Sequence, residues 1–125
     1  MQRLFGLIPK PAPLRPRSRV YDLKDRLDWG EPALTIIDTR DRESFNESHV
    51  MGAISIPAPS LVSRSLSCLE LDRDLYIYAD TDEESDVLVQ LLQDAGFKNV
   101  SVLRGGVAAW KAAGFPVELA GLAVA

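Results

Sequence analysis

The sequence has few of the side chains that disulfides, metal sites and nucleophilic catalysis require. Its 125 residues include one cysteine, Cys68, and one histidine, His49. A single cysteine cannot close a disulfide within the chain, and a lone histidine without a cysteine pair is a poor ligand set for zinc. We therefore expect no disulfide framework, no metal site and no cofactor, and a reducing compartment such as the cytoplasm.

Long hydrophobic runs are also missing. The apolar patch nearest the start occupies positions 4–8. A membrane-spanning helix needs ~20 apolar residues, and the core of a signal peptide has roughly 7 to 15. We expect no membrane span and no secretion signal, whereas a transit peptide stays open.

Acidic residues are absent from the first 20 positions. That segment holds five of the 14 Lys and Arg residues, and all 18 Asp and Glu residues follow it, against the nine remaining basic ones. Such an acidic body argues against nucleic acid as the partner, because phosphate binding draws on a basic face of the fold. Four prolines between positions 9 and 16 disfavour regular structure, so residues 1–19 are predicted to form a flexible basic arm.

The rest of the chain alternates short apolar runs with helical patterns. Expected strands cover residues 34–37, 54–57, 75–78 and 100–103, and Val20 and Tyr21 could join a sheet edge. Expected helices cover residues 22–27, 41–47, 60–66 and 107–113, with one more after Thr81. This alternation with short links predicts an α/β domain over residues 20–118, with a mostly parallel sheet covered on both faces. Residues 119–125 form a tail without an assignable pattern.

The stretch 75–97 is the centre of this pattern. Its strand is followed by Thr81 and Glu84 at the spacing of a helix capping box, and Gly96 is expected to end the helix. The expected helical face consists of Val87, Leu88, Leu91, Leu92 and Ala95. The expected loop between strand and helix consists of Ala79, Asp80, Thr81, Asp82, Glu83 and Glu84, with Ser85 and Asp86 starting the helix.

A loop in this position is a natural anion cradle, because free backbone N–H groups and the positive end of the helix dipole meet there. This loop contains no nucleophile, since Ala79 carries only a methyl group. Its four carboxylates are themselves expected to face the dipole, each gaining roughly 0.3 to 1 kcal/mol. We therefore predict that these carboxylates, and not an external anion, occupy the anion-binding position.

The order of these motifs resembles the rhodanese-like domain family. The matching segments are IDTRDRESFNESHVMGAISIP at 37–57, YIYADTDEESDVLVQLLQDAGF at 76–97 and VSVLRGGVAAWKAAGFPVE at 100–118. Several weak motifs in the right order, including Gly-Gly-x-x-Ala-Trp, carry the resemblance. It implies a single α/β domain with a mostly parallel five-stranded sheet flanked by helices.

The resemblance also implies where sulfurtransferase chemistry would take place. Active members place a cysteine directly after the central strand, where it carries sulfur as a persulfide, and an arginine near the helix start. Ala79 stands at the cysteine position and Glu84 at the arginine position. Alanine at position 79 removes the nucleophile. Glutamate at position 84 replaces a cation that attracts anions by a carboxylate that repels them. The same changes remove the related phosphatase chemistry.

Other residues have more ordinary interpretations. Asp38 and Arg40 match the family's Asp-x-Arg pattern near the loop, and Arg40 is expected to pair with Asp38 or with the acidic loop. His49 is expected in a structural turn. Cys68 is expected to be an ordinary, partly buried cysteine.

Two functions stay open at this point. The first is a non-catalytic module, protein-binding or regulatory, whose binding loop of residues 79–85 meets an unknown, basic protein partner. The acidic residues of that loop could instead serve only helix capping and solubility. The alternative is a thiosulfate-type sulfurtransferase that uses Cys68 as a displaced sulfur carrier. The sequence predicts no oligomeric state.

Overall fold

The computed structural model describes residues 14–30 and 33–119. Most of the predicted basic arm and all of the tail after residue 119 lie outside this range. At the centre is a five-stranded sheet in which every neighbouring pair of strands is parallel. The strand order is β1 (Arg17–Ser18), β6 (Asn99–Leu103), β5 (Asp74–Tyr78), β2 (Leu34–Asp38) and β4 (Ile54–Ser55). The predicted fold class is confirmed.

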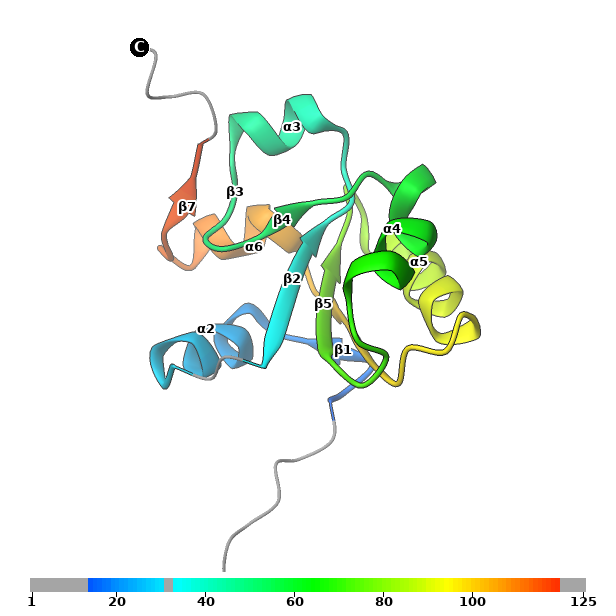
Figure 1. Cartoon of the computed structure of the whole chain (residues 1–125). Helices are drawn as coiled ribbons and strands as arrows, with labels where there is room; N and C mark the ends of the chain where they lie inside the picture. The colour runs from blue at the N-terminus through cyan, green and yellow to red at the C-terminus, as the bar shows by residue number, and fades with distance from the viewer. Residues whose placement is uncertain (1–13, 31–32, 120–125) are drawn as a thin grey trace, which may run out of the picture.

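Helices cover both faces of this sheet (Figure 1). They are α2 (Val20–Asp28), α3 (Arg42–Glu47), α4 (Leu61–Cys68), α5 (Asp82–Asp94) and α6 (Gly106–Ala112), with a 3-10 turn η1 (Ala58–Ser60) before α4. Successive side chains of β5 alternate between the two faces, as a strand requires. Leu75 and Ile77 pack towards α4 and α5, whereas Tyr76 and Tyr78 join the core that contains Trp110 of α6.

A second, two-stranded sheet lies outside the main one. Strand β3 (His49–Val50) pairs antiparallel with β7 (Val117–Glu118). No strand was predicted at either position, because two-residue strands leave no periodic pattern. Their pairing brings the end of the domain back onto the segment that follows α3.

The amino-terminal boundary of the fold differs from the prediction. Val20 and Tyr21 start α2, and the strand at the sheet edge is Arg17–Ser18, inside the predicted flexible arm. Val102 N donates to Pro16 O, and Arg104 N donates to Ser18 O, both at 2.9 Å. Proline fits here because only its carbonyl is needed at a sheet edge. The arm was therefore predicted to extend too far.

The buried face of α5 also differs from the prediction. The helix ends at Asp94, just before Gly96, as expected. Its buried residues are Ser85, Leu88, Val89 and Leu92. Val87 and Leu91 are 61% and 46% exposed, so the five residues expected to share one helical face do not all lie on the buried side. Apolar residues occur on both sides of this helix, and periodicity alone cannot tell which side faces the sheet.

The described helices are too short or too polar to cross a membrane.

Candidate functional site

The connection between β5 and α5 lies at the carboxyl edge of the sheet, where α/β proteins place their ligand sites. It is shorter than predicted, because α5 begins at Asp82 and only residues 79–81 lie between the two elements. Thr81 caps the helix, and its Oγ1 accepts a hydrogen bond from Glu84 N at 3.2 Å. Asp82, Glu83 and Glu84 therefore form the first helical turn, not the second half of a loop.

The buried side chain of Ser85 forms hydrogen bonds to both ends of this connection, which we call closed for this reason. Ser85 Oγ accepts from Ala79 N and donates to Thr81 O, both at 2.9 Å, and Ser85 is 1% exposed. The backbone N–H directly after the central strand is thus already paired. The carboxylates of this segment were expected to occupy the cradle, but that was wrong: the N–H groups of Ala79 and Glu84 donate to the Ser85 and Thr81 hydroxyls instead.

The acidic side chains point elsewhere. Asp82 Oδ1 accepts from Gly105 N at 3.0 Å, which ties the start of α5 to the turn between β6 and α6. Asp80, Glu83 and Glu84 are exposed. In the second turn, the Asp86 carboxylate pairs with the Arg17 guanidinium of β1, and this pairing raises the pKa of Arg17. One residue of the predicted arm thus meets the acidic helix within the same chain.

Asp38 and Arg40 form a buried ion pair next to this connection. Arg40 Nη2 donates to Asp38 Oδ2 at 2.7 Å and Nε donates to Oδ1 at 3.1 Å. Asp38 is fully buried, and Arg40 Nη2 also donates to Ser48 O at 2.6 Å. Burial opposes the charge of Arg40, but its hydrogen bonds to Asp38 raise its pKa overall. Of the two partners considered for Arg40, the structure shows Asp38.

The residue between them joins β2 to the end of β5. Thr39 N and Thr39 Oγ1 both donate to Tyr78 O, at 3.0 and 2.9 Å. Tyr78 Oη accepts from Val50 N at 3.1 Å, and burial raises the pKa of this phenol. The last residue of the central strand is therefore held by backbone and side-chain bonds on two sides.

His49 was expected in a structural turn, but it lies in strand β3, where it is buried. Its ring stacks on Phe45 with 3.7 Å between centroids, and Nδ1 lies 2.7 Å from Phe45 O. His49 is 5% exposed and its Nε2 is 3.5 Å from Glu118 Oε1, so it fixes the junction of β3 and β7.

Cys68 lies far from the β5–α5 connection along the fold. Helix α4 leaves the carboxyl edge of β4 and returns the chain to the amino end of β5, so its last residue, Cys68, lies towards the amino edge. Shortly after it, Leu71 O accepts from the N–H of Lys98, the residue that precedes β6. The thiol is exposed, contrary to the expected partial burial, and donates to Arg64 O at 2.9 Å. It does not face the residue 79–81 backbone.

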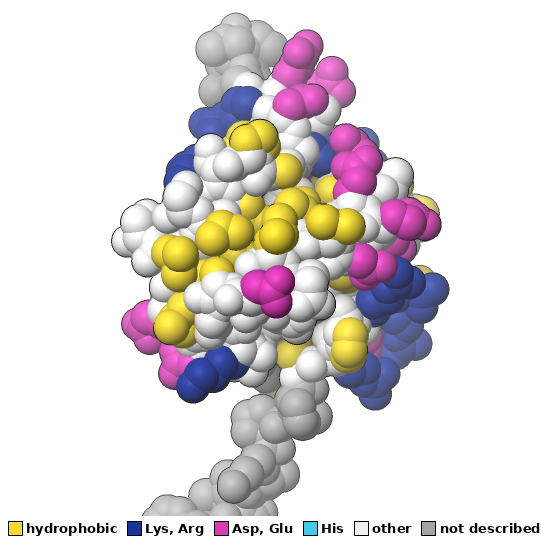
Figure 2. All heavy atoms as spheres, turned by 90° about the vertical axis from the view of Figure 1, so that its right-hand side faces the viewer, with side chains coloured by type: hydrophobic (Ala, Val, Ile, Leu, Met, Phe, Trp, Pro, Cys, Tyr) yellow, Lys and Arg dark blue, Asp and Glu magenta, His cyan; other side chains and the backbone are white. Residues whose placement is uncertain are grey.

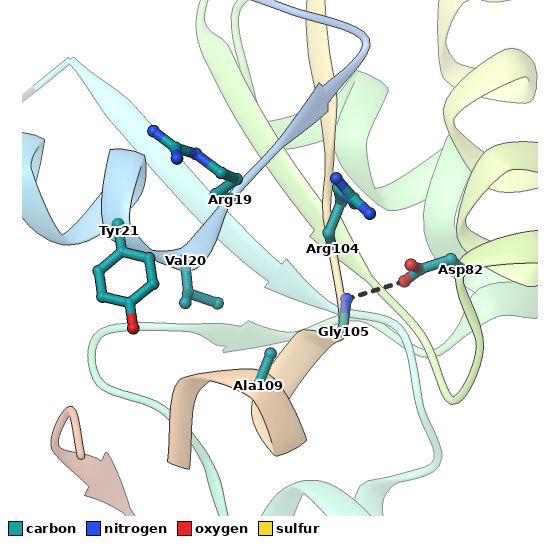
Figure 3. A pocket seen from close by; sticks show the side chains of 7 residues that line it. All are labelled: Arg19, Val20, Tyr21, Asp82, Arg104, Gly105 and Ala109. Carbon is teal, nitrogen blue, oxygen red and sulfur yellow. Dashed lines mark hydrogen bonds between the residues drawn. The ribbon is translucent and has the colours of Figure 1, made fainter. Parts of the chain in front are cut away.

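A pocket of about 360 Å³ opens beside the closed connection, at the same edge of the sheet (Figure 3). It is lined by Arg19, Val20, Tyr21, Asp82, Arg104, Gly105 and Ala109. Of these residues, only Asp82 was expected from the sequence to belong to a site. The sequence feature that could have pointed to this pocket is Arg104, a cation directly between an apolar strand pattern and two glycines. Within residues 14–30 and 33–119, no cluster of His, Cys, Asp and Glu is suited to hold a metal ion.

The all-parallel five-stranded sheet, covered on both faces and with short connections at its carboxyl edge, defines a small α/β domain. The family model of the rhodanese-like domain matches residues 20–113, and the chain belongs to this family.

Solved structures agree with this assignment. The crystal structure of the Alr3790 protein from Anabaena sp. is 51% identical with a TM-score of 0.81, covering 83% of this chain and 81% of that one. A thiosulfate sulfurtransferase from Pseudomonas aeruginosa has a TM-score of 0.73 at 24% identity, covering 87% of this chain and 20% of that one. The second likeness concerns the fold alone.

Curated relatives include proteins of different kinds. The HTH-type transcriptional regulator Rv0324 of Mycobacterium tuberculosis is 36% identical over 100 residues, 78% of this chain and 42% of the regulator. The thiosulfate sulfurtransferase GlpE of Shewanella oneidensis is 32% identical over 78 residues, 62% of this chain and 76% of GlpE. The chain spans less than half the length of the first relatives it matches, 42% and 24%.

Proposed function

We propose that this rhodanese-like domain is non-catalytic and binds a partner protein. The observation that carries the proposal is the state of the backbone after β5. Ala79 stands where a sulfur-carrying cysteine would be needed, and its N–H donates to the buried Ser85 hydroxyl. A persulfide needs a thiolate with hydrogen-bond donors around it. This connection has no thiol, and the N–H of Ala79 itself is already paired.

The electrostatics of the connection support the same conclusion. Glu84 stands at the position of the anion-binding arginine and is exposed in the first turn of α5, next to Glu83. An approaching thiosulfate would meet carboxylates where an active enzyme presents a cation. Arg40, a cation beside this connection that could replace it, is held by Asp38.

The outward side of α5 supplies a surface for a partner. Glu83, Val87 and Leu91 follow one another at intervals of four residues and therefore form one exposed ridge. Leu66 of α4 is 50% exposed, and Leu71 packs at the end of α5, over Gly96. Figure 2 shows a band of hydrophobic side chains across this face, with most of the visible acidic side chains above it and to its right and a group of basic side chains below them at the right. The complementary partner is a segment with apolar residues flanked by Lys or Arg.

The relatives are compatible with a binding role. The matched region of the mycobacterial regulator is 42% of that protein, so a domain of this kind occurs within a longer chain that is named for regulation. GlpE is named for the sulfurtransferase activity that the alternative requires. The position of Cys68 towards the amino edge gives that alternative no structural support.

The catalytic half of the proposal is tested by a thiosulfate:cyanide sulfurtransferase assay. Wild type and Cys68→Ser are expected to be equally inactive, and the double variant Ala79→Cys, Glu84→Arg is expected to gain turnover. Ala79→Ser with Glu84→Arg is the matched control, since it restores the cation without the thiol. Activity in wild type that disappears in Cys68→Ser would establish the displaced carrier and overturn the proposal.

The binding half is tested with an amphipathic leucine–lysine peptide of roughly 15 residues, long enough to form a helix. We expect amide NMR shifts along the ridge of Glu83, Val87 and Leu91, and weaker binding by Leu91→Glu. Leu119→Glu, another exposed leucine outside this face, is the control. Equal binding of a leucine–glutamate peptide would argue against charge complementarity.

A further inference from the structure

The pocket beside the closed connection is a separate feature from the ridge of α5. Its walls come from the start of α2, the start of α5 and the turn between β6 and α6 (Figure 3). All of these lie at the carboxyl edge of the sheet, and none of the pocket residues belongs to the Ala79–Thr81 backbone.

The charged side chains around the pocket differ in whether they have partners. Arg19 pairs with Asp22 at 3.1 Å, and Asp82 is bound to Gly105 N at 3.0 Å. Arg104 is exposed, and its guanidinium forms no hydrogen bond or ion pair with the part of the chain that the structure describes. In Figure 3 the Arg104 side chain rises from the rim of the pocket on the same side as Arg19. Arg104 is thus a cation at the rim to which the described part of the chain offers no partner.

Two further features shape the pocket. Gly105 has φ +74°, and a Cβ there would lie 2.5 Å from Ala109 Cβ, so the turn approaches α6 as closely as only glycine permits. Tyr21 is 55% exposed and packs edge-on against Phe115, with 5.4 Å between ring centroids. The pocket therefore combines a planar aromatic wall, a small apolar floor and a guanidinium with free donors.

We propose that this pocket binds an oxyanion attached to a small apolar or aromatic body, with Arg104 as the principal contact. A guanidinium offers parallel N–H donors that match a phosphate or carboxylate group, and charge-assisted hydrogen bonds of this kind are the strong ones. Tyr21 contacts the body of the ligand, and Arg19 adds positive charge at the rim. The site is distinct from the closed β5–α5 connection and from the surface proposed for a partner protein.

The test is an NMR titration of the full chain at constant ionic strength, with inorganic phosphate, phenyl phosphate and phenylacetate as probes. We expect saturable shifts at the amides of Tyr21, Gly105 and Ala109 and at Arg104 Nε. Arg104→Gln is expected to weaken binding about tenfold to a hundredfold, the loss of a charged hydrogen-bonding group. Arg104→Lys keeps the positive charge but loses the parallel N–H donors of the guanidinium, so its affinity is expected to be intermediate.

The matched control is Arg64→Gln, an exposed arginine on α4, which should bind like wild type. Stronger binding of phenyl phosphate than of inorganic phosphate would support a phosphate monoester, and preference for phenylacetate would support a carboxylate ligand. Shifts that do not saturate, or equal affinity in wild type and Arg104→Gln, would overturn the proposal. Neither result depends on the sulfurtransferase assay, so the two proposals can fail independently.

Discussion

The connections after β5 and after β6 are neighbours at one edge of the same sheet, yet they have opposite properties. The first is closed by the Ser85 hydroxyl and surrounded by carboxylates. The second contains two glycines and an arginine that has no partner among residues 14–30 and 33–119, and it opens into a pocket. Both sit where an α/β fold provides N–H groups and helix dipoles. The comparison shows that the side chains of a connection, not its place in the fold, decide whether its backbone is bonded internally or borders a pocket.

The largest effect is expected where the closed connection is anchored. Asp38→Ala leaves Arg40 buried without its carboxylate, which typically costs about 3–5 kcal/mol. We expect a loss of this size in urea unfolding, together with faster amide exchange in residues 79–81. Asp80→Ala, an exposed acidic residue of the same edge, should change stability by less than about 0.5 kcal/mol. Similar losses in the two variants would contradict the anchoring role.

The open connection is tested by adding one methyl group. Gly105→Ala places a Cβ 2.5 Å from Ala109 Cβ in a left-handed conformation, so backbone strain and overpacking add up to about 2–4 kcal/mol. Gly52→Ala separates the two causes. Gly52 has φ +84° with no atom within 4 Å of the added Cβ, so only the backbone cost of about 1–2 kcal/mol is expected. Thermal unfolding of both variants measures the difference.

Removing the Ser85 hydroxyl, which closes the β5–α5 connection, is expected to have a smaller effect on stability. Ser85→Ala removes the acceptor of Ala79 N–H in a buried place, at a cost of about 1–3 kcal/mol. Amide exchange at Ala79 should accelerate. Ser63→Ala, whose exposed hydroxyl donates to Ser60 O, is the control and should be nearly neutral. An unchanged exchange rate at Ala79 would show that Ser85 does not close the connection.

The smallest effect concerns the connection after β2, where a carboxylate caps α3. Ser44 N donates to Asp41 Oδ1 at 2.7 Å and lowers the pKa of Asp41 below its ordinary value of 3.8. A carboxyl whose pKa is lower in the folded state contributes stability above pH 3.8, and this is lost as the pH falls through the folded pKa. Asp41→Asn keeps a capping acceptor without titrating. Its stability relative to wild type should therefore rise as the pH falls below 3.8, measured by urea unfolding.

The sequence by itself determined the features that depend on neighbouring residues. Apolar runs and capping signals located the four predicted strands to within two residues, the Thr81 cap and the end of α5 before Gly96. The identity of Ala79 was evident without coordinates. These features follow from local backbone preferences and side-chain periodicity, which act over a few residues.

Only the tertiary structure decided which side chains from distant segments meet. Arg17 lies against Asp86 and Asp82 against Gly105, although 69 and 23 residues separate them in the chain. The same holds for the exposure of Val87 and Leu91, which depends on the direction from which α5 packs on the sheet. Arg104 has no hydrogen-bond or ion-pair partner among the described residues, whereas Arg19 pairs with Asp22 and Asp82 accepts from Gly105 N. Which of these groups pair with one another depends on the packing of the whole chain. It cannot be predicted from a local sequence pattern.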